Sequence, residues 1–194
     1  TMAGSLAQHN AEVMAGAVFA QLVAAGTPVI YGSVSGVMDL RSADISLGSM
    51  ESIMFNSCVV QLADYYGLPN RIQSGNPSAR EPGIRAAVET AWGLQMSIAA
   101  GGNLITTGLL DSTLLISLEH LVLMDELISQ IRSASAASIV DAGHLAKEVI
   151  REEGRPGTRY MSHEHTLEFM HEAMYYSEFT GRMKESYQDW YELA

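Results

Sequence analysis

Residues 28–32, Pro-Val-Ile-Tyr-Gly, form a short apolar run between two chain breakers. A run of this length and composition is typical of a strand buried in a parallel sheet. The preceding residues 7–25 are small or apolar on nearly every face, and Gly26 and Pro28 follow them. This pattern predicts a helix buried between two layers that ends just before the strand.

The same alternation of helix and strand continues along the chain. Further strands are predicted over residues 71–74 and 103–107, and helices over residues 51–66, 83–100 and 111–133. Strands that start near residues 28, 71 and 103 have the spacing of βα units in a parallel sheet. The pattern therefore predicts an α/β fold, and it leaves open an open doubly wound sheet or part of a (β/α)8 barrel.

Two segments depart from this alternation. Residues 33–50 contain several glycines and serines and predict a long loop, which in a compact domain is usually functional. Residues 133–138 are small and predict a linker. Beyond it we expect short helices over residues 141–153 and 162–176, and a helical end over the last fifteen residues. The sequence thus divides into residues 1–134 and a helical segment, residues 135–194.

The overall charge excludes several function classes. The 194 residues include 11 Lys and Arg against 22 Asp and Glu, a net charge of −11. We therefore expect neither nucleic-acid binding nor attraction to an anionic membrane surface. Cys58 is the single cysteine, and no apolar run is long enough to span a membrane. Without a recognisable leader peptide, the sequence predicts a soluble, cytoplasmic protein.

Several familiar chemistries lack their sequence signals. No glycine-rich nucleotide-binding motif follows any predicted strand. The only lysines, Lys147 and Lys184, lie beyond the linker, which argues against a Schiff-base enzyme. His163, His165 and His171 do not have the spacing of a zinc protease helix, so we expect no metal site.

The best places for a functional site are the loops that follow the strands. In parallel α/β folds the reacting groups lie there, which here means residues 31–41, 73–80 and 107–111. Tyr31 fits equally a core position and a pocket wall. Asp39 and Arg41 could pair with each other or bind a ligand. Composition and spacing alone do not indicate a reaction.

Five collinear stretches carry a family resemblance: residues 3–22, 26–52, 61–71, 117–127 and 162–169. Examples are QLADYYGLPNR (61–71), SLEHLVLMDEL (117–127) and SHEHTLEF (162–169). Together they resemble the C-terminal part of the trimethylamine methyltransferase family, the cobalamin-linked amine methyltransferases. The resemblance implies the C-terminal portion of a (β/α)8 TIM barrel with a helical C-terminal extension. Residues 1–134 would be the partial barrel, since a whole barrel takes about 250 residues.

One position bears on the substrate. Family members that act on trimethylamine place pyrrolysine in a loop after a late barrel strand, and the matching position here is Asn76. Pyrrolysine activates an amine through its lone pair, and asparagine cannot do so. A quaternary ammonium has no lone pair and already carries its leaving group. The resemblance therefore implies the non-pyrrolysine branch, acting on a quaternary amine such as glycine betaine.

The resemblance also implies partners and binding residues. We expect a small methylated amine as substrate and a corrinoid protein as methyl acceptor, with no cofactor bound directly. Tyr31 and Asp39 are the candidates for the trimethylammonium group, and Arg41 and Arg80 for a carboxylate. A homo-oligomer is left open. The alternatives are a non-catalytic barrel fragment that binds a small amine or a partner, and a folate-linked barrel methyltransferase.

Overall fold

The structure is a computed structural model that describes residues 1–136, 139–155, 157 and 159–177. It divides into two compact units, residues 1–131 and 132–194. The centre of the first unit is a parallel sheet of β1 (Tyr31–Ser33), β4 (Asn70–Gln73) and β5 (Leu104–Thr106). These strands are neighbours in the order β1-β4-β5, which is also their order along the chain. The α/β class with a parallel sheet is thereby confirmed.

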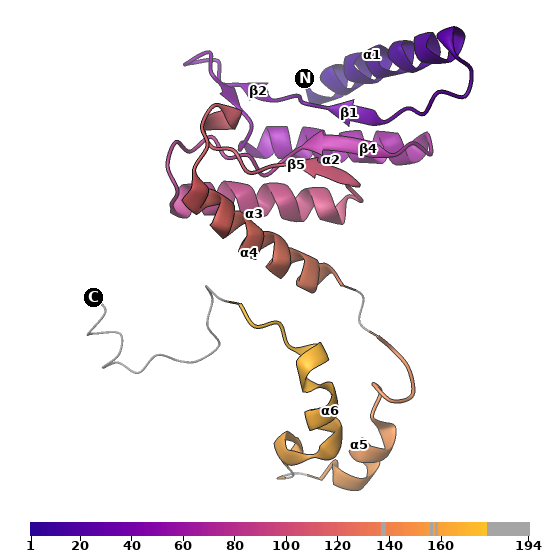
Figure 1. Cartoon of the computed structure of the whole chain (residues 1–194), viewed down its shortest axis with the longest axis vertical. Coiled ribbons are helices and arrows are strands. Elements are labelled where there is room, and N and C mark those ends of the chain that lie inside the picture. The colour runs from indigo at the N-terminus through magenta and orange to yellow at the C-terminus, as the bar shows by residue number, and fades with distance from the viewer. Residues whose placement is uncertain (137–138, 156, 158, 178–194) are drawn as a thin grey trace. The chain divides into compact units, whose positions relative to one another are not determined.

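Helices alternate with these strands, as Figure 1 shows. They are α1 (Met2–Val23), α2 (Met50–Tyr65), α3 (Ile84–Ala99) and α4 (Leu118–Ser135). Ser49 caps α2, since its hydroxyl accepts a hydrogen bond from the Ser52 backbone N–H. Gly67 follows α2 in the left-handed conformation, the usual end of a helix.

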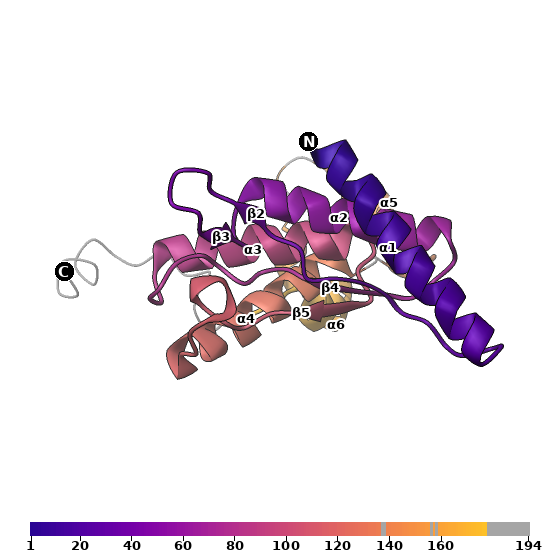
Figure 2. The same cartoon turned by 90° about the horizontal axis from the view of Figure 1, so that it is seen from above.

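The core of the first unit lies between the sheet and its helices. Tyr31 and Ile72 point from the sheet into one cluster with Phe55, Val59 and Val60. A second cluster joins α3 to α4 and reaches the sheet at Ile105; its buried members are Leu94, Met124 and Ile131. Figure 2 shows α2 and α3 running along the same side of the strands.

The opposite face of the sheet carries the alternate residues of each strand. Leu104 and Thr106, on either side of Ile105, are both exposed. The helices of the first unit therefore pack against one face of the sheet. Because the strands are parallel, their carboxyl ends and the loops that follow lie at one edge of the sheet, where the cavity described below lies.

The long loop predicted over residues 33–50 contains a small hairpin. Strands β2 (Val37–Met38) and β3 (Ile45–Ser46) pair antiparallel within it. Each strand is only two residues long, which is too short for an alternating pattern to be visible in the sequence. The hairpin gives this segment a defined shape beside the strand ends.

The predicted burial of the first helix between two layers is wrong for the described structure. No residue of α1 is buried. One side packs against the core through Met2, Leu6, Val13 and Met14. The other side leaves large apolar side chains exposed, with Phe19 at 69% and Leu22 at 80%. An apolar pattern gives the tendency to be buried, whereas actual burial needs a second layer.

The helix predicted from residue 111 begins later. Residues Asp111–Thr113 form a short 3-10 turn, η1, and α4 starts only at Leu118. All three residues of the turn have positive φ, at 49°, 51° and 83°. This backbone cannot continue into a right-handed helix, so the chain must reverse before α4 begins.

The second unit contains α5 (Lys147–Glu153), the 3-10 turn η2 (Tyr160–Ser162) and α6 (Glu164–Ala173). His144 links its parts, with Nδ1 at 2.8 Å from Asp141 Oδ1 and Nε2 at 3.3 Å from Glu172 Oε1. The helix predicted for the last fifteen residues lies outside the described residues. None of the helices that the structure describes is both long and apolar enough to cross a membrane.

Candidate functional site

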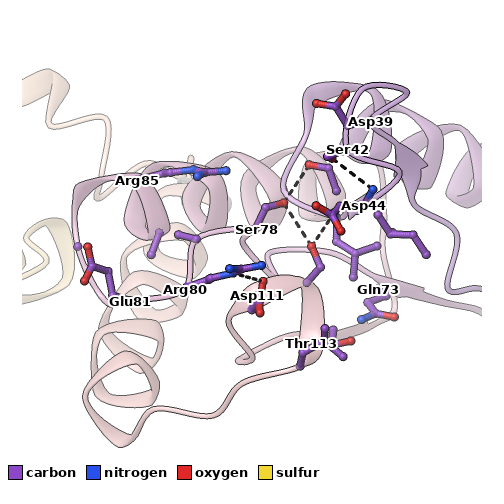
Figure 3. A pocket seen from close by; sticks show the side chains of 18 of the residues that line it. Asp39, Ser42, Asp44, Gln73, Ser78, Arg80, Glu81, Arg85, Asp111 and Thr113 are labelled. Carbon is purple, nitrogen blue, oxygen red and sulfur yellow. Dashed lines mark hydrogen bonds and ion pairs between the residues drawn. The ribbon is translucent and has the colours of Figure 1, made fainter.

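A cavity of about 1010 Å³ lies at the carboxyl ends of the strands in the first unit. Its walls come from the β2–β3 hairpin, the loop after β4, the first turn of α3 and the η1 turn after β5 (Figure 3). Parallel strands bring these loops to one edge of the sheet, although they are far apart in the sequence. The cavity therefore collects the three strand-end loops that the sequence singles out.

The hydroxyl of Ser78 joins these walls. Its Oγ lies 2.9 Å from Ser46 Oγ on the hairpin, and it accepts hydrogen bonds from Gly48 N (3.2 Å) and Ser112 Oγ (3.3 Å). The Ser78 backbone N–H donates to Glu89 Oε2 on α3 at 2.6 Å. One residue thus connects the hairpin, the loop after β4, the η1 turn and α3.

The η1 turn holds a charged pair at the cavity. Arg80 Nε lies 3.1 Å from Asp111 Oδ1. Asp111 also donates its backbone N–H to Ala79 O at 2.8 Å, which fixes the turn against the loop after β4. Three successive non-glycine residues with positive φ are costly, and such strain clusters at functional sites. The strained turn places the Asp111 carboxylate beside the Arg80 guanidinium.

Acidic side chains outnumber basic ones around the cavity. The acidic lining residues are Asp39, Asp44, Glu81 and Asp111, and the basic ones are Arg80 and Arg85. Arg85 is paired with Glu89 of the next helical turn at 2.7 Å. No aromatic side chain lines the cavity in the part of the chain that the structure describes. The walls therefore favour a cationic ligand through carboxylates rather than through aromatic faces.

Metal-binding groups are not gathered at this site. Within the described residues, no group of three or more His, Cys, Asp or Glu side chains could hold a metal ion. His120, in the first turn of α4, is buried, and this burial lowers its pKa. Its Nε2 makes no hydrogen bond to the described residues.

Comparison with known proteins gives the family. Residues 1–193 match the family model described as trimethylamine methyltransferase. The chain belongs to the trimethylamine methyltransferase family. It is 34% identical over 168 residues to glycine betaine methyltransferase of Desulfitobacterium hafniense (strain Y51), covering 86% of this chain and 35% of that protein. It is 34% identical over 154 residues to trimethylamine methyltransferase MttB of Methanosarcina thermophila, covering 79% of this chain and 32% of that protein.

A second relative from Desulfitobacterium hafniense (strain DSM 10664 / DCB-2), trimethylamine methyltransferase MttB, is 33% identical over 171 residues, 88% of this chain and 34% of that protein. The chain thus spans about a third of the length of the curated relatives it matches. The family resemblance read from the five sequence stretches is confirmed.

Two of the residues expected at the site of this family member line the cavity, namely Asp39 and Arg80. Arg41 is paired with Asp39 at 3.5 Å, but its side chain is 93% exposed. It is not among the residues that line the cavity. The structure therefore brings Asp39 and Arg80 into one cavity and leaves Arg41 outside the cavity lining, paired with Asp39.

Tyr31, also expected at the site, lies outside the cavity. It begins β1, is fully buried, and donates its hydroxyl to Asn10 Oδ1 at 3.0 Å. Burial raises its pKa, and the His9 ring packs edge-on against it at 5.7 Å. This placement, at the start of the strand rather than its end, gives Tyr31 a packing role outside the cavity lining.

Asn76, at the position matching pyrrolysine, is also buried. Its Nδ2 donates to Thr106 O and its Oδ1 accepts from Leu109 N, each at 3.0 Å. Both ends of the amide are thus used to join the loops after β4 and β5. Asn76 does not line the cavity.

Sequence reasoning missed three contributors to the cavity: Gln73, Ser78 and Asp111. All three fall within the predicted strand-end loops, so their position along the chain was the available signal. What the sequence lacks is any sign that Asp111 pairs with Arg80, 31 residues earlier. Left-handed backbone at non-glycine residues leaves no recognisable pattern either.

Proposed function

We propose that this chain is part of a methyltransferase that transfers a methyl group from a quaternary amine, such as glycine betaine, to a corrinoid protein. Membership of the trimethylamine methyltransferase family supports methyl transfer. The relative named glycine betaine methyltransferase supports the choice of amine. The observation that carries the proposal is the acid-rich cavity at the strand ends, with Arg80 in its wall.

The cavity has charges of both signs for a zwitterion. Asp39 and the other carboxylates attract the trimethylammonium head through Coulomb forces. Arg80 is held by Asp111 through Nε, and its side chain is 79% exposed. Its terminal nitrogens make no hydrogen bond to the described residues, so they are available to a substrate carboxylate. The same guanidinium therefore serves the turn and the substrate.

Methyl transfer from a quaternary amine does not require these residues to donate or accept a proton. A quaternary ammonium carries no proton and already has a positive leaving group, so no general acid is needed to expel the tertiary amine. The methyl acceptor is the reduced corrinoid of the partner protein, which supplies a strong nucleophile when bound. This chain's own residues hold and orient the amine, and orientation of this kind contributes much of a rate enhancement.

The surrounding architecture is proposed to be the C-terminal part of a (β/α)8 barrel. The three parallel strands keep chain order, and the helices pack on one face. A doubly wound sheet covers both faces and reverses its strand order. The site at the carboxyl ends of the strands also matches the place where barrel enzymes act.

The test uses the full-length protein with a reduced corrinoid protein. Glycine betaine should produce methylcobalamin absorbance, and the Arg80→Ala variant should reduce its rate. Ligand-induced stabilisation without methyl transfer from any betaine or methylamine would contradict the proposal and favour a binding protein. Methylation that depends on an added pterin would favour a folate-linked enzyme.

A further inference from the structure

One side-chain amide that faces the cavity makes no hydrogen bond to the described residues. Gln73 is the last residue of β4, the middle strand of the sheet, and only 7% of it is exposed. It lines the cavity, and Figure 3 shows its side chain beneath the hairpin near Thr113. Its side-chain amide makes no hydrogen bond to any described residue, whereas a glutamine amide can donate two and accept two.

Neighbouring buried amides use both their nitrogen and their oxygen. Asn70, at the other end of β4, donates to Gly101 O and accepts from Asn103 N. Asn76, three residues after Gln73, joins the next two loops through both of its ends. The Gln73 amide differs from these two, because it opens to the cavity and its donors and acceptors are not used by the described residues. The cavity that Gln73 lines is where a partner from outside the chain can enter.

The charges around Gln73 define the chemistry of that partner. Each arginine of the cavity is paired with a carboxylate, Arg80 with Asp111 through Nε and Arg85 with Glu89. Asp44 and Glu81 form no ion pair with the described residues, so negative charge remains in excess. A free amide beside this charge offers hydrogen bonds without cancelling the attraction for a cation. The combination fits a cation that also carries an oxygen group.

We propose that Gln73 is a specificity-determining residue that hydrogen-bonds the carboxylate of a betaine-type substrate. It thereby selects quaternary amines that carry a carboxylate over those that carry only alkyl groups. This assignment rests on the proposed function, since it names what distinguishes the substrate within that cavity. Hydrogen bonds to charged groups are among the stronger ones, so the selectivity gained is large enough to measure.

The test is a set of binding measurements by calorimetry on the full-length protein. Glycine betaine is compared with tetramethylammonium, which has the same cationic head but no oxygen. Gln73→Leu should weaken glycine betaine binding on the order of tenfold or more, because one charge-assisted hydrogen bond is lost. Tetramethylammonium binding should stay within about twofold, since the hydrogen bond is absent there.

Two further variants separate a specific role from a structural one. Gln73→Glu keeps the shape but adds a negative charge, so it should weaken glycine betaine binding and strengthen tetramethylammonium binding. Gln95→Leu makes the same change as Gln73→Leu at an exposed position of α3 outside the cavity lining, and should alter neither. Opposite shifts for the two ligands in Gln73→Glu cannot arise from partial unfolding.

Equal weakening of both ligands by Gln73→Leu, no effect on either, or no glycine betaine binding by the unaltered protein would each overturn the assignment. The methyl-transfer assay keeps this outcome distinct from the fate of the proposed function. Selectivity that depends on Gln73 without methyl transfer supports the residue's role and refutes the methyltransferase. Methyl transfer with selectivity unchanged in Gln73→Leu refutes the role of Gln73 alone.

Discussion

Gly93 lies where α3 passes closest to the loop that leaves β4, and Gly93→Ala should disrupt that contact. An added Cβ would lie 2.5 Å from the backbone nitrogen of Gly75 and 2.8 Å from its Cα. Ordinary contacts of a Cβ begin at 3.4 Å, so the helix and the loop must separate by close to 1 Å. The obstacle is backbone, which cannot rotate away as a side chain can.

The magnitude follows from two opposing effects. Overpacking a closely packed contact costs about 1–3 kcal/mol, and a backbone obstacle places this site at the upper end. Alanine in a helix interior returns up to about 1 kcal/mol relative to glycine. We therefore expect Gly93→Ala to lower the free energy of unfolding by about 2 kcal/mol. Because the displaced loop also carries Asn76 and Ser78, glycine betaine binding should weaken with it.

The assay is urea unfolding followed by circular dichroism, with Gly16→Ala as the matched control. Gly16 is also a helical glycine, in α1, but nothing lies within 4 Å of its added Cβ. The same substitution there should raise the free energy of unfolding by up to about 1 kcal/mol. If Gly93→Ala matched or exceeded Gly16→Ala in stability, the close approach of α3 and the loop would be refuted.

Three further predictions follow from single contacts. Asn76→Ala should lower the free energy of unfolding by about 2–3 kcal/mol, because it removes both hydrogen bonds of a buried side chain. Loss of methyl transfer at unchanged stability would instead indicate a catalytic role. Arg80→Ala should change stability by less than about 1 kcal/mol, since its ion pair is exposed, while slowing methyl transfer from glycine betaine. Hydrogen bonding to Asp141 and Glu172 raises the pKa of His144 above its ordinary value. The bridge therefore stabilises the second unit while His144 is protonated and its partners are ionised, and this stabilisation is lost as pH rises through the raised pKa. An NMR titration of His144 should show that raised pKa, and Asp141→Asn should lower it.

The order of helices and strands could be predicted because it depends on local signals. The first strand of the parallel sheet ends a short apolar run between breakers, and the α2 boundaries follow from Ser49 and Gly67. The hairpin and the η1 turn could not be predicted, since two-residue strands and left-handed non-glycine residues leave no periodic trace. The prediction that α1 is buried was wrong for a different reason, because burial depends on which other segments cover the helix.

The candidate site was predictable in location but only partly in membership. The rule that sites form at the carboxyl ends of parallel strands indicated the loops that line this cavity, and with them Asp39 and Arg80. It also led to Tyr31, which the structure places at the start of its strand rather than the end. A boundary shift of two or three residues, ordinary in sequence-based prediction, moves a side chain from the cavity to the core.

The three amides of β4 and its loop show why membership needs the tertiary structure. Asn70, Gln73 and Asn76 look alike in sequence, since each is a polar residue within one short segment. The partners that use up Asn70 and Asn76 come from about thirty residues later, at Asn103 and Leu109. Those partners are set by the register of β5 against β4, and the same register leaves Gln73 without one. A polar side chain beside a cavity is available to a ligand when the fold gives it no hydrogen-bond partner. Whether it has such a partner depends on the strand pairing and not on the residue type.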